Sequence, residues 1–187
     1  KQFIKAIHRN SERLKNLVDD LLHLSRIEGG SLNMTIEKIN LDHIVESTIL
    51  NLEQEALRKD IKIESLVDKR IEVLSDFISL DIIISNYLNN AIAYSPNNSK
   101  ITISAEEAYE KIKLSVKDEG EGIPENYKDR VFERFFRVDK GRSLNQGGTG
   151  LGLSIVKNLA STLSSPVGVE NQEPNGASFW IELDKST

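Results

Sequence analysis

Apolar residues in the first 28 positions recur with the period of a helix. The stripe consists of Ile4, Ile7, Leu14, Leu17, Val18, Leu21 and Leu24. Ile7, Leu14 and Leu21 follow one another at intervals of seven residues, and no glycine or proline occurs before Gly29-Gly30. This spacing is typical of a helix that packs against other helices in a coiled coil or four-helix bundle. We predict one long helix that pairs with another helix or, as the alternative, folds back on the rest of the chain.

After Gly30, short alternating segments and longer helical segments follow one another. The pattern predicts strands over 32–39, 61–66, 71–74, 100–104, 112–117, 167–170 and 178–183, and helices over 41–58, 76–94, 125–132 and 151–163. Asn40 is placed to cap the first of these helices, and Pro96 follows the end of the second. The strands at 100–104 and 112–117 are expected to form an antiparallel pair. The fold class is therefore α+β, a mixed sheet covered by helices on one face.

Two asparagines on the predicted helix 76–94 could bind a metal ion. Asn86 and Asn90 are four residues apart, so they share one face of that helix. Amide oxygens are suitable ligands for Mg²⁺, which takes few protein ligands and completes its shell with water and phosphate. The alternative is that both asparagines only face solvent.

A carboxylate followed by two glycines ends the predicted strand at 112–117. Asp118 could accept a hydrogen bond from an exocyclic amine such as that of adenine. Gly120 and Gly122 would let the backbone turn and let a flat ring approach closely. An ordinary Asp-Gly turn is the alternative.

A glycine-rich loop comes just before the predicted helix 151–163. The glycines at 141, 147, 148 and 150 predict that 137–150 is a mobile loop, and Gly148-Thr149-Gly150-Leu151-Gly152 leads into the helix. Backbone N–H groups at a helix start can bind phosphate, and glycine permits a close approach. No Lys-Ser or Lys-Thr follows, which excludes a P-loop. Upstream, the aromatic residues of 132–137 are expected to anchor the loop, and Arg134 or Arg137 could reach a phosphate.

Composition narrows the possible functions. The 187 residues carry a net charge of −5 and no cysteine, which excludes disulfides and thiolate chemistry and disfavours a nucleic-acid partner. No apolar run reaches the roughly 20 residues needed to span a bilayer. Met34 is the single methionine, so we expect a fragment whose membrane segments could precede Lys1.

Four segments together resemble the ATP-binding boxes of sensor histidine kinases. Asn86–Ser95 is similar to the N box, Asp118–Pro124 to the G1 box, Phe132–Arg137 to the F box and Gly148–Val156 to the G2 box. The first helix resembles the second helix of the family's dimerisation and phosphoacceptor domain. The resemblance covers nearly the whole chain and implies a Bergerat-type ATP-binding fold. It also implies two parts, a partial helical hairpin at 1–29 and a catalytic domain at 30–187.

The resemblance also implies roles for individual residues. Asn90 would bind Mg²⁺ with Asn86 in support, Asp118 would bind the adenine amino group, and Tyr94 would lie beside the nucleotide. Arg137 would help to neutralise charge during transfer. The remaining implied cofactor-binding residues are Gly120, Gly122, Gly148, Thr149, Gly150, Leu151 and Gly152.

Two departures from the family pattern matter. None of His8, His23 and His43 has the acidic residue and proline that follow a phosphoacceptor histidine, so the acceptor is expected upstream of Lys1. Ala93 stands where the family often has a basic residue, which removes one candidate phosphate contact.

The resulting hypothesis is the ATP- and Mg²⁺-dependent core of a protein-histidine kinase that lacks its acceptor. By family resemblance it would serve a response regulator receiver domain, form a homodimer through the helical hairpin of the intact protein, and lie in the cytoplasm within a membrane-anchored parent. The alternatives are a serine kinase of the anti-sigma-factor type and a degenerate nucleotide-binding or dimerisation module.

Overall fold

The computed structural model describes residues 2–29, 33–138 and 149–186. The helices are α1 (Gln2–Glu28), α2 (Leu41–Leu57), α3 (Phe77–Tyr94) and α5 (Gly152–Thr162), with a short 3-10 helix at Glu125–Tyr127. The strands are β1 (Ile36–Asn40), β2 (Lys62–Ser65), β3 (Glu72–Asp76), β4 (Lys100–Ala108), β5 (Lys111–Lys117), β6 (Val167–Asn171) and β7 (Ala177–Lys185).

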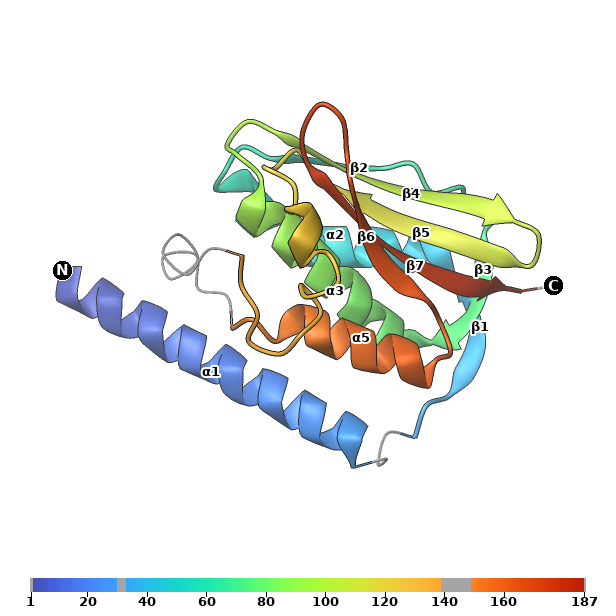
Figure 1. Cartoon of the computed structure of the whole chain (residues 1–187), viewed down its shortest axis with the longest axis horizontal. Helices are drawn as coiled ribbons and strands as arrows, with labels where there is room; N and C mark the ends of the chain where they lie inside the picture. The colour runs from blue at the N-terminus through green and yellow to red at the C-terminus, as the bar shows by residue number, and fades with distance from the viewer. Residues whose placement is uncertain (1, 30–32, 139–148, 187) are drawn as a thin grey trace.

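One mixed sheet forms the upper layer of the molecule (Figure 1). The strands run in the order β1-β3-β7-β5-β4-β2, and β6 pairs with β7. The pairing of β2 with β4 is parallel, and the other pairings are antiparallel. Helices α2, α3 and α5 lie on one side of this sheet, as the fold class requires. The predicted α+β architecture is confirmed.

Side-chain caps explain where two of the helices begin. Asn40 accepts a hydrogen bond from the His43 amide at 2.9 Å and starts α2. Asp76 accepts from the Ser79 amide at 2.9 Å and starts α3. These caps satisfy amide groups that have no partner within the helix. Both caps lie at the end of a strand, so each strand passes directly into a helix.

The core lies between the sheet and the three covering helices. Alternating residues of β4 and β5 point into it, among them Ile101, Ile103, Ile112 and Leu114, which are all fully buried. Tyr87 of α3 is also fully buried and donates its hydroxyl hydrogen to the Trp180 carbonyl of β7 at 3.0 Å. The core therefore holds α3 firmly against the sheet, which matters because α3 carries the N-box asparagines.

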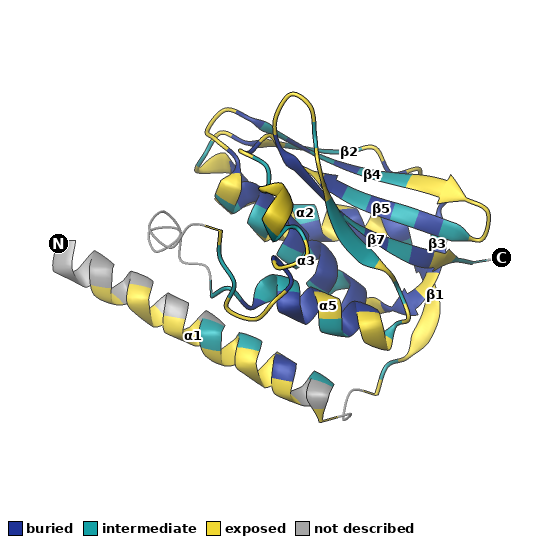
Figure 2. Ribbon diagram, in the orientation of Figure 1, coloured by how far each residue is buried: buried dark blue, intermediate teal, exposed yellow. Residues whose placement is uncertain are grey.

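Helix α1 runs along the outer side of α5 (Figure 1). Leu24 is buried there, and Ile27 packs against the core. By contrast Ile7, Leu14 and Val18 are exposed, and Figure 2 shows most of the described residues of this helix in yellow. The C-terminal end of α1 thus contacts the rest of the chain, and the described part of its apolar stripe remains mostly uncovered. The side chains of Ile4 and His8 lie outside the described residues.

Three details of the sequence prediction need correction or qualification. The helix expected over 125–132 is only a 3-10 turn at Glu125–Tyr127, followed by single turns, because the amides of Lys128, Arg130 and Glu133 each donate to the carbonyl group three residues earlier. The strand expected over 32–39 is β1, which begins only at Ile36 and ends at Asn40. Most of the predicted mobile loop, 139–148, lies outside the described residues.

Candidate functional site

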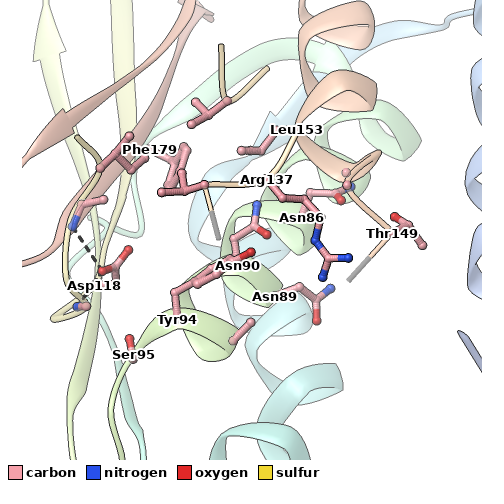
Figure 3. Close-up of a pocket in the computed structure, with 18 of the residues that line it drawn as sticks. Asn86, Asn89, Asn90, Tyr94, Ser95, Asp118, Arg137, Thr149, Leu153 and Phe179 are labelled. Atoms are coloured by element: carbon pink, nitrogen blue, oxygen red, sulfur yellow. Dashed lines mark hydrogen bonds between the residues drawn. The ribbon is translucent and has the colours of Figure 1, made fainter. Parts of the chain in front are cut away.

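A cavity of about 1270 Å³ brings the four sequence boxes together. Helix α3 forms its floor, the turn after β5 closes one end, and the start of α5 closes the other. Figure 3 shows Asp118, Asn90 and Thr149 from left to right across it. Of the predicted site residues, the cavity is lined by Asn86, Asn90, Tyr94, Asp118, Gly120, Gly122, Arg137, Thr149, Gly150 and Gly152. Ten of the twelve residues predicted for the site therefore lie along this cavity.

Two predicted residues are not in the described wall. Leu151 is fully buried in the core behind the cavity, where its side chain anchors the start of α5. Its amide N–H donates to Thr149 Oγ1 at 3.2 Å. Gly148 lies outside the described residues.

The two asparagines of α3 that were predicted to bind a metal ion, Asn86 and Asn90, have different surroundings. Asn86 donates from Nδ2 to the Ile82 carbonyl at 2.8 Å, and its Oδ1 faces Gly152. A Cβ at position 152 would lie 2.3 Å from that oxygen, so α3 and α5 meet there in direct contact. The side-chain amide of Asn90 makes no hydrogen bond within the described part of the chain, and it lies in the middle of the cavity (Figure 3). Asn90 is thus the asparagine that is free to bind a ligand.

Asp118 presents one carboxylate oxygen to the cavity. Its Oδ1 accepts hydrogen bonds from the Gly120 amide at 2.8 Å and the Ala177 amide at 3.2 Å. Both bonds use the same oxygen, so Oδ2 has no partner among the described residues. Burial raises the pKa of the Asp118 carboxyl, although these two N–H donors act to lower it. The site therefore holds a fixed, poorly hydrated acceptor suited to an exocyclic amine.

The loop after Asp118 is held by a residue that sequence reasoning missed. Asn171 at the end of β6 accepts from the Ile123 amide and donates to the Ile123 carbonyl, both at 2.8 Å. Gly122, with a φ of +75°, lies directly against this amide. Only the pairing of β6 with β7 brings Asn171 to this loop, so no local sequence pattern identifies it.

Gly176 was also missed. It has a φ of +115°, and a Cβ there would lie 2.0 Å from the Asp118 carbonyl oxygen. The turn between β6 and β7 therefore packs directly against the backbone of Asp118. The one available signal was the Pro174-Asn175-Gly176 turn, which does not indicate what the turn contacts.

The F-box aromatics contact described residues before position 139 and after position 148. Phe132 is buried with its ring edge toward Phe179, 6.4 Å between centroids, and Phe136 packs edge-on against Tyr127 at 5.5 Å. The amide of Phe135 donates to the Gly150 carbonyl at 2.8 Å, although the Phe135 side chain is exposed. Phe132 and Phe136 are thus packed against Phe179 and Tyr127, whereas most of the loop that they were expected to anchor lies outside the described residues. Arg137 lines the cavity, whereas Arg134 does not.

A hydroxyl joins the glycine loop to α1. Thr149 donates to Asp20 Oδ2 at 2.6 Å, and Asp19, Asp20 and His23 of α1 form one side of the cavity. This contact between the first helix and the loop was not predicted, because the two residues are 129 positions apart.

The described lining is strongly acidic. Its carboxylates are Asp19, Asp20, Asp81, Asp118, Glu119 and Glu121, and Arg137 is the single arginine or lysine among the described lining residues. Such a wall disfavours an uncompensated phosphate group. A divalent cation would offset that repulsion, and the Asn90 amide oxygen is a suitable ligand for it. No cluster of three acidic or histidine side chains that could hold a metal by itself occurs among the described residues.

None of the helices in residues 2–29, 33–138 and 149–186 combines the length and apolar character needed to cross a bilayer.

Comparison with known proteins agrees with this geometry. The family model described as histidine kinase-, DNA gyrase B-, and HSP90-like ATPase matches residues 75–187, which contain all four boxes. The sensor-like histidine kinase SenX3 of Mycolicibacterium smegmatis is 35% identical over 183 residues, covering 98% of this chain and 48% of that protein. The chain therefore spans about half the length of this relative.

Solved structures show the same arrangement of elements. Full-length ShkA in complex with AMPPNP aligns over 100% of this chain and 39% of that chain, with a TM-score of 0.85 and 26% identity. Histidine kinase ThkA in complex with the response regulator TrrA aligns over 100% of this chain and 51% of that chain, with a TM-score of 0.80 and 26% identity. This chain therefore belongs to the family of histidine kinase-, DNA gyrase B- and HSP90-like ATPases, and it is a catalytic ATP-binding domain of the sensor histidine kinase type.

Proposed function

We propose that the cavity binds ATP with Mg²⁺ and that the intact protein transfers the γ-phosphoryl group to a histidine outside this chain. The observation that carries the proposal is that Asp118 Oδ2, at one end of the cavity, has no partner among the described residues, while the start of α5 behind Thr149 lies at the other end. Between these two ends Asn90 offers a free amide. A base, a metal ion and a phosphate chain require these three groups in this order.

The adenine end is formed by Asp118, Gly120, Gly122 and Tyr94. Asp118 Oδ2 would accept from the 6-amino group, and a charged acceptor makes this bond stronger than a neutral one. A Cβ at position 120 would lie 2.9 Å from Asp118 Oδ1 and 3.0 Å from the Tyr94 carbonyl oxygen. Asp118 and Tyr94 are therefore close together here, and only a glycine fits between them without overlap. Tyr94 is half-exposed and would cover one side of the base.

The phosphate end is formed by Arg137, Thr149, Gly150, Gly152 and the start of α5. Helix α5 begins without a side-chain cap, so its first amide groups are available to an anion. Asn90 would hold Mg²⁺, with Asn86 keeping α3 in contact with α5. Bound Mg²⁺ supplies charge neutralisation on the phosphates. Arg137 would add positive charge at the same end, and phosphoryl transfer depends mostly on such positioning.

The domain organisation follows from this proposal. Residues 1–29 would be the second helix of a dimerisation hairpin, and 30–187 the catalytic domain. The exposed residues Ile7, Leu14, Val18 and Leu21 of α1 support a helical partner in the intact protein, as a homodimer. We further propose a cytoplasmic location beneath a membrane-anchored parent and a response regulator receiver domain as the final phosphoryl acceptor, in line with the complex formed by ThkA.

Calorimetric titration with a non-hydrolysable ATP analogue and Mg²⁺ tests the binding step. We expect binding by the unmodified chain, weaker binding by Asp118→Asn and Asn90→Ala, and loss of the Mg²⁺ dependence in Asn90→Ala only. No binding by the folded chain would refute the kinase proposal and favour a degenerate module.

A second experiment tests the acceptor. A separately produced segment carrying the upstream histidine is added with ATP, and the phosphoamino acid is identified by its stability in acid and base. We expect acid-labile phosphohistidine. Acid-stable phosphoserine on an added protein would support the serine kinase instead.

A further inference from the structure

The ammonium group of Lys59 is bound to the last turn of α3. Its Nζ donates to the carbonyl oxygens of Ile92 at 2.7 Å, Ala93 at 2.7 Å and Ser95 at 3.2 Å. A lysine ammonium has three hydrogens, so all three donors are used. The carbonyl groups at the end of a helix lack partners within it and carry the negative end of the helix dipole. Lys59 therefore supplies both the hydrogen-bond donors that these carbonyl groups lack and a positive charge at the negative end of the helix dipole.

The main chain of Lys59 binds the same region. Its carbonyl oxygen accepts from the Asn98 amide at 3.0 Å, and the Lys62 amide donates to the Ser99 carbonyl at 2.9 Å. The turn after α2 and the turn after α3 are thus joined by both the side chain and the backbone. Lys59 is half-buried, and burial lowers the pKa of its ammonium group. Water therefore competes weakly for these hydrogen bonds.

The turn that Lys59 holds is part of the adenine end of the cavity. Tyr94 and Ser95 both line the cavity, and the Tyr94 carbonyl oxygen lies against Gly120. Gly120 in turn donates its amide hydrogen to Asp118 Oδ1. A displacement of the last turn of α3 would therefore change the space between Tyr94 and Asp118.

From these contacts we propose that Lys59 is a positioning residue for the base of the bound nucleotide. It touches no lining atom of the phosphate end, and it acts by fixing Tyr94 and Ser95 relative to Asp118. The proposal rests on the nucleotide-binding function proposed above. It predicts an effect on the base subsite that is independent of the number of phosphates.

The test measures affinities of AMP, ADP and ATP for the unmodified chain and for Lys59→Met, which keeps the aliphatic stem and loses all three donors. We expect about a 10-fold loss of affinity, equal for the three nucleotides, because bonds from a charged donor are lost at the base end. Lys59→Arg, which restores a charged donor, is expected to recover most of the affinity. Hydrogen exchange at the Ser95 amide, which donates to Ala91, should become faster in Lys59→Met.

Two control variants separate positioning from general stability. Lys62→Met removes an exposed lysine of the adjoining strand, and Val67→Ala destabilises the core away from the cavity. Neither should change nucleotide affinity, even where Val67→Ala lowers the melting temperature as far as Lys59→Met does. If Lys59→Met does not fold, Lys59→Gln replaces it, since the amide keeps two N–H donors without charge.

The outcomes are distinguishable. Failure of the unmodified chain to bind any nucleotide would refute the proposed function itself. Unchanged affinities in a folded Lys59→Met, a loss confined to ATP, or an equal loss in Val67→Ala would each overturn the positioning role and leave the nucleotide site intact.

Discussion

Thr149 donates its hydroxyl hydrogen to Asp20 Oδ2 across 2.6 Å, and this bond joins the phosphate end of the cavity to α1. Thr149 also accepts the Leu151 amide hydrogen at 3.2 Å, so its hydroxyl connects α1 with the N-cap residue of α5. Burial is the largest influence on Asp20 and raises the pKa of its carboxyl, while the bond from Thr149 acts in the opposite direction. A carboxylate is therefore held where phosphate groups are expected.

Replacing Asp20 by asparagine tests this relationship. Asp20→Asn keeps an oxygen that can accept from Thr149 and removes the negative charge. We expect ATP to bind about 2- to 5-fold more tightly, which corresponds to the repulsion of partly screened charges. Calorimetry at low and high salt measures the effect, which should shrink as salt rises. Asp19→Asn, at an exposed neighbouring carboxylate, serves as the control, and an equal gain there would show that the contact with Thr149 has no special role.

Asp118 should make both nucleotide affinity and stability depend on pH. Its pKa is raised above the ordinary value of 3.8, so the folded protein binds a proton more readily than the unfolded chain does. Stability in the absence of nucleotide should then fall as pH rises from about 3.8 through the raised pKa. Binding of ADP should change in the opposite direction, because the ionised carboxylate is the better acceptor. Thermal melts and calorimetry across this range, compared with Asp118→Asn, check both trends, and parallel pH profiles for the two proteins would contradict them.

The contact between Asn86 and Gly152 predicts a coupled pair of mutations. Gly152→Ala would place a Cβ 2.3 Å from Asn86 Oδ1, and we expect a loss of about 1–3 kcal/mol in the free energy of unfolding. Adding Asn86→Ala should relieve the overlap, so the double variant should be more stable than the sum of the single changes predicts. Urea denaturation of the four proteins measures the coupling. Strict additivity would show that the two helices can separate without cost.

Asn171 should control the loop that follows Asp118. Asn171→Ala removes both bonds to Ile123, and we expect a loss of about 1 kcal/mol in stability because the group is exposed. Affinity for ADP should fall by up to about 10-fold, since the loop would no longer hold Gly122 in place. Gln172→Ala is the matched control one residue away. Equal affinities in the two variants would exclude a role for Asn171 in the site.

The chemical content of the site could be predicted from the sequence because it is carried by short local motifs. Asn86 and Asn90 share a helical face because they are four residues apart. Asp118 is followed by two glycines, and glycines also flank the predicted loop, where they allow backbone conformations that few other residues tolerate. The same holds for the elements, since Asn40 caps α2 as its side chain predicts. The helix expected over 125–132 was wrong because the backbone there forms hydrogen bonds between residues three apart, such as Arg130 and Tyr127, in place of a continuous α-helical series.

By itself the sequence determined the fold class, most elements and ten of the residues that line the cavity, because periodicity, caps and glycine positions act over a few residues. Only the tertiary structure decided which distant groups support them. Lys59 reaches α3 through the docking of two turns, Asn171 reaches the loop after Asp118 through the pairing of β6 with β7, and Asp20 reaches Thr149 through the packing of α1 on α5. These contacts depend on how separate elements pack, and packing is set by the whole core at once, which no short stretch of sequence encodes.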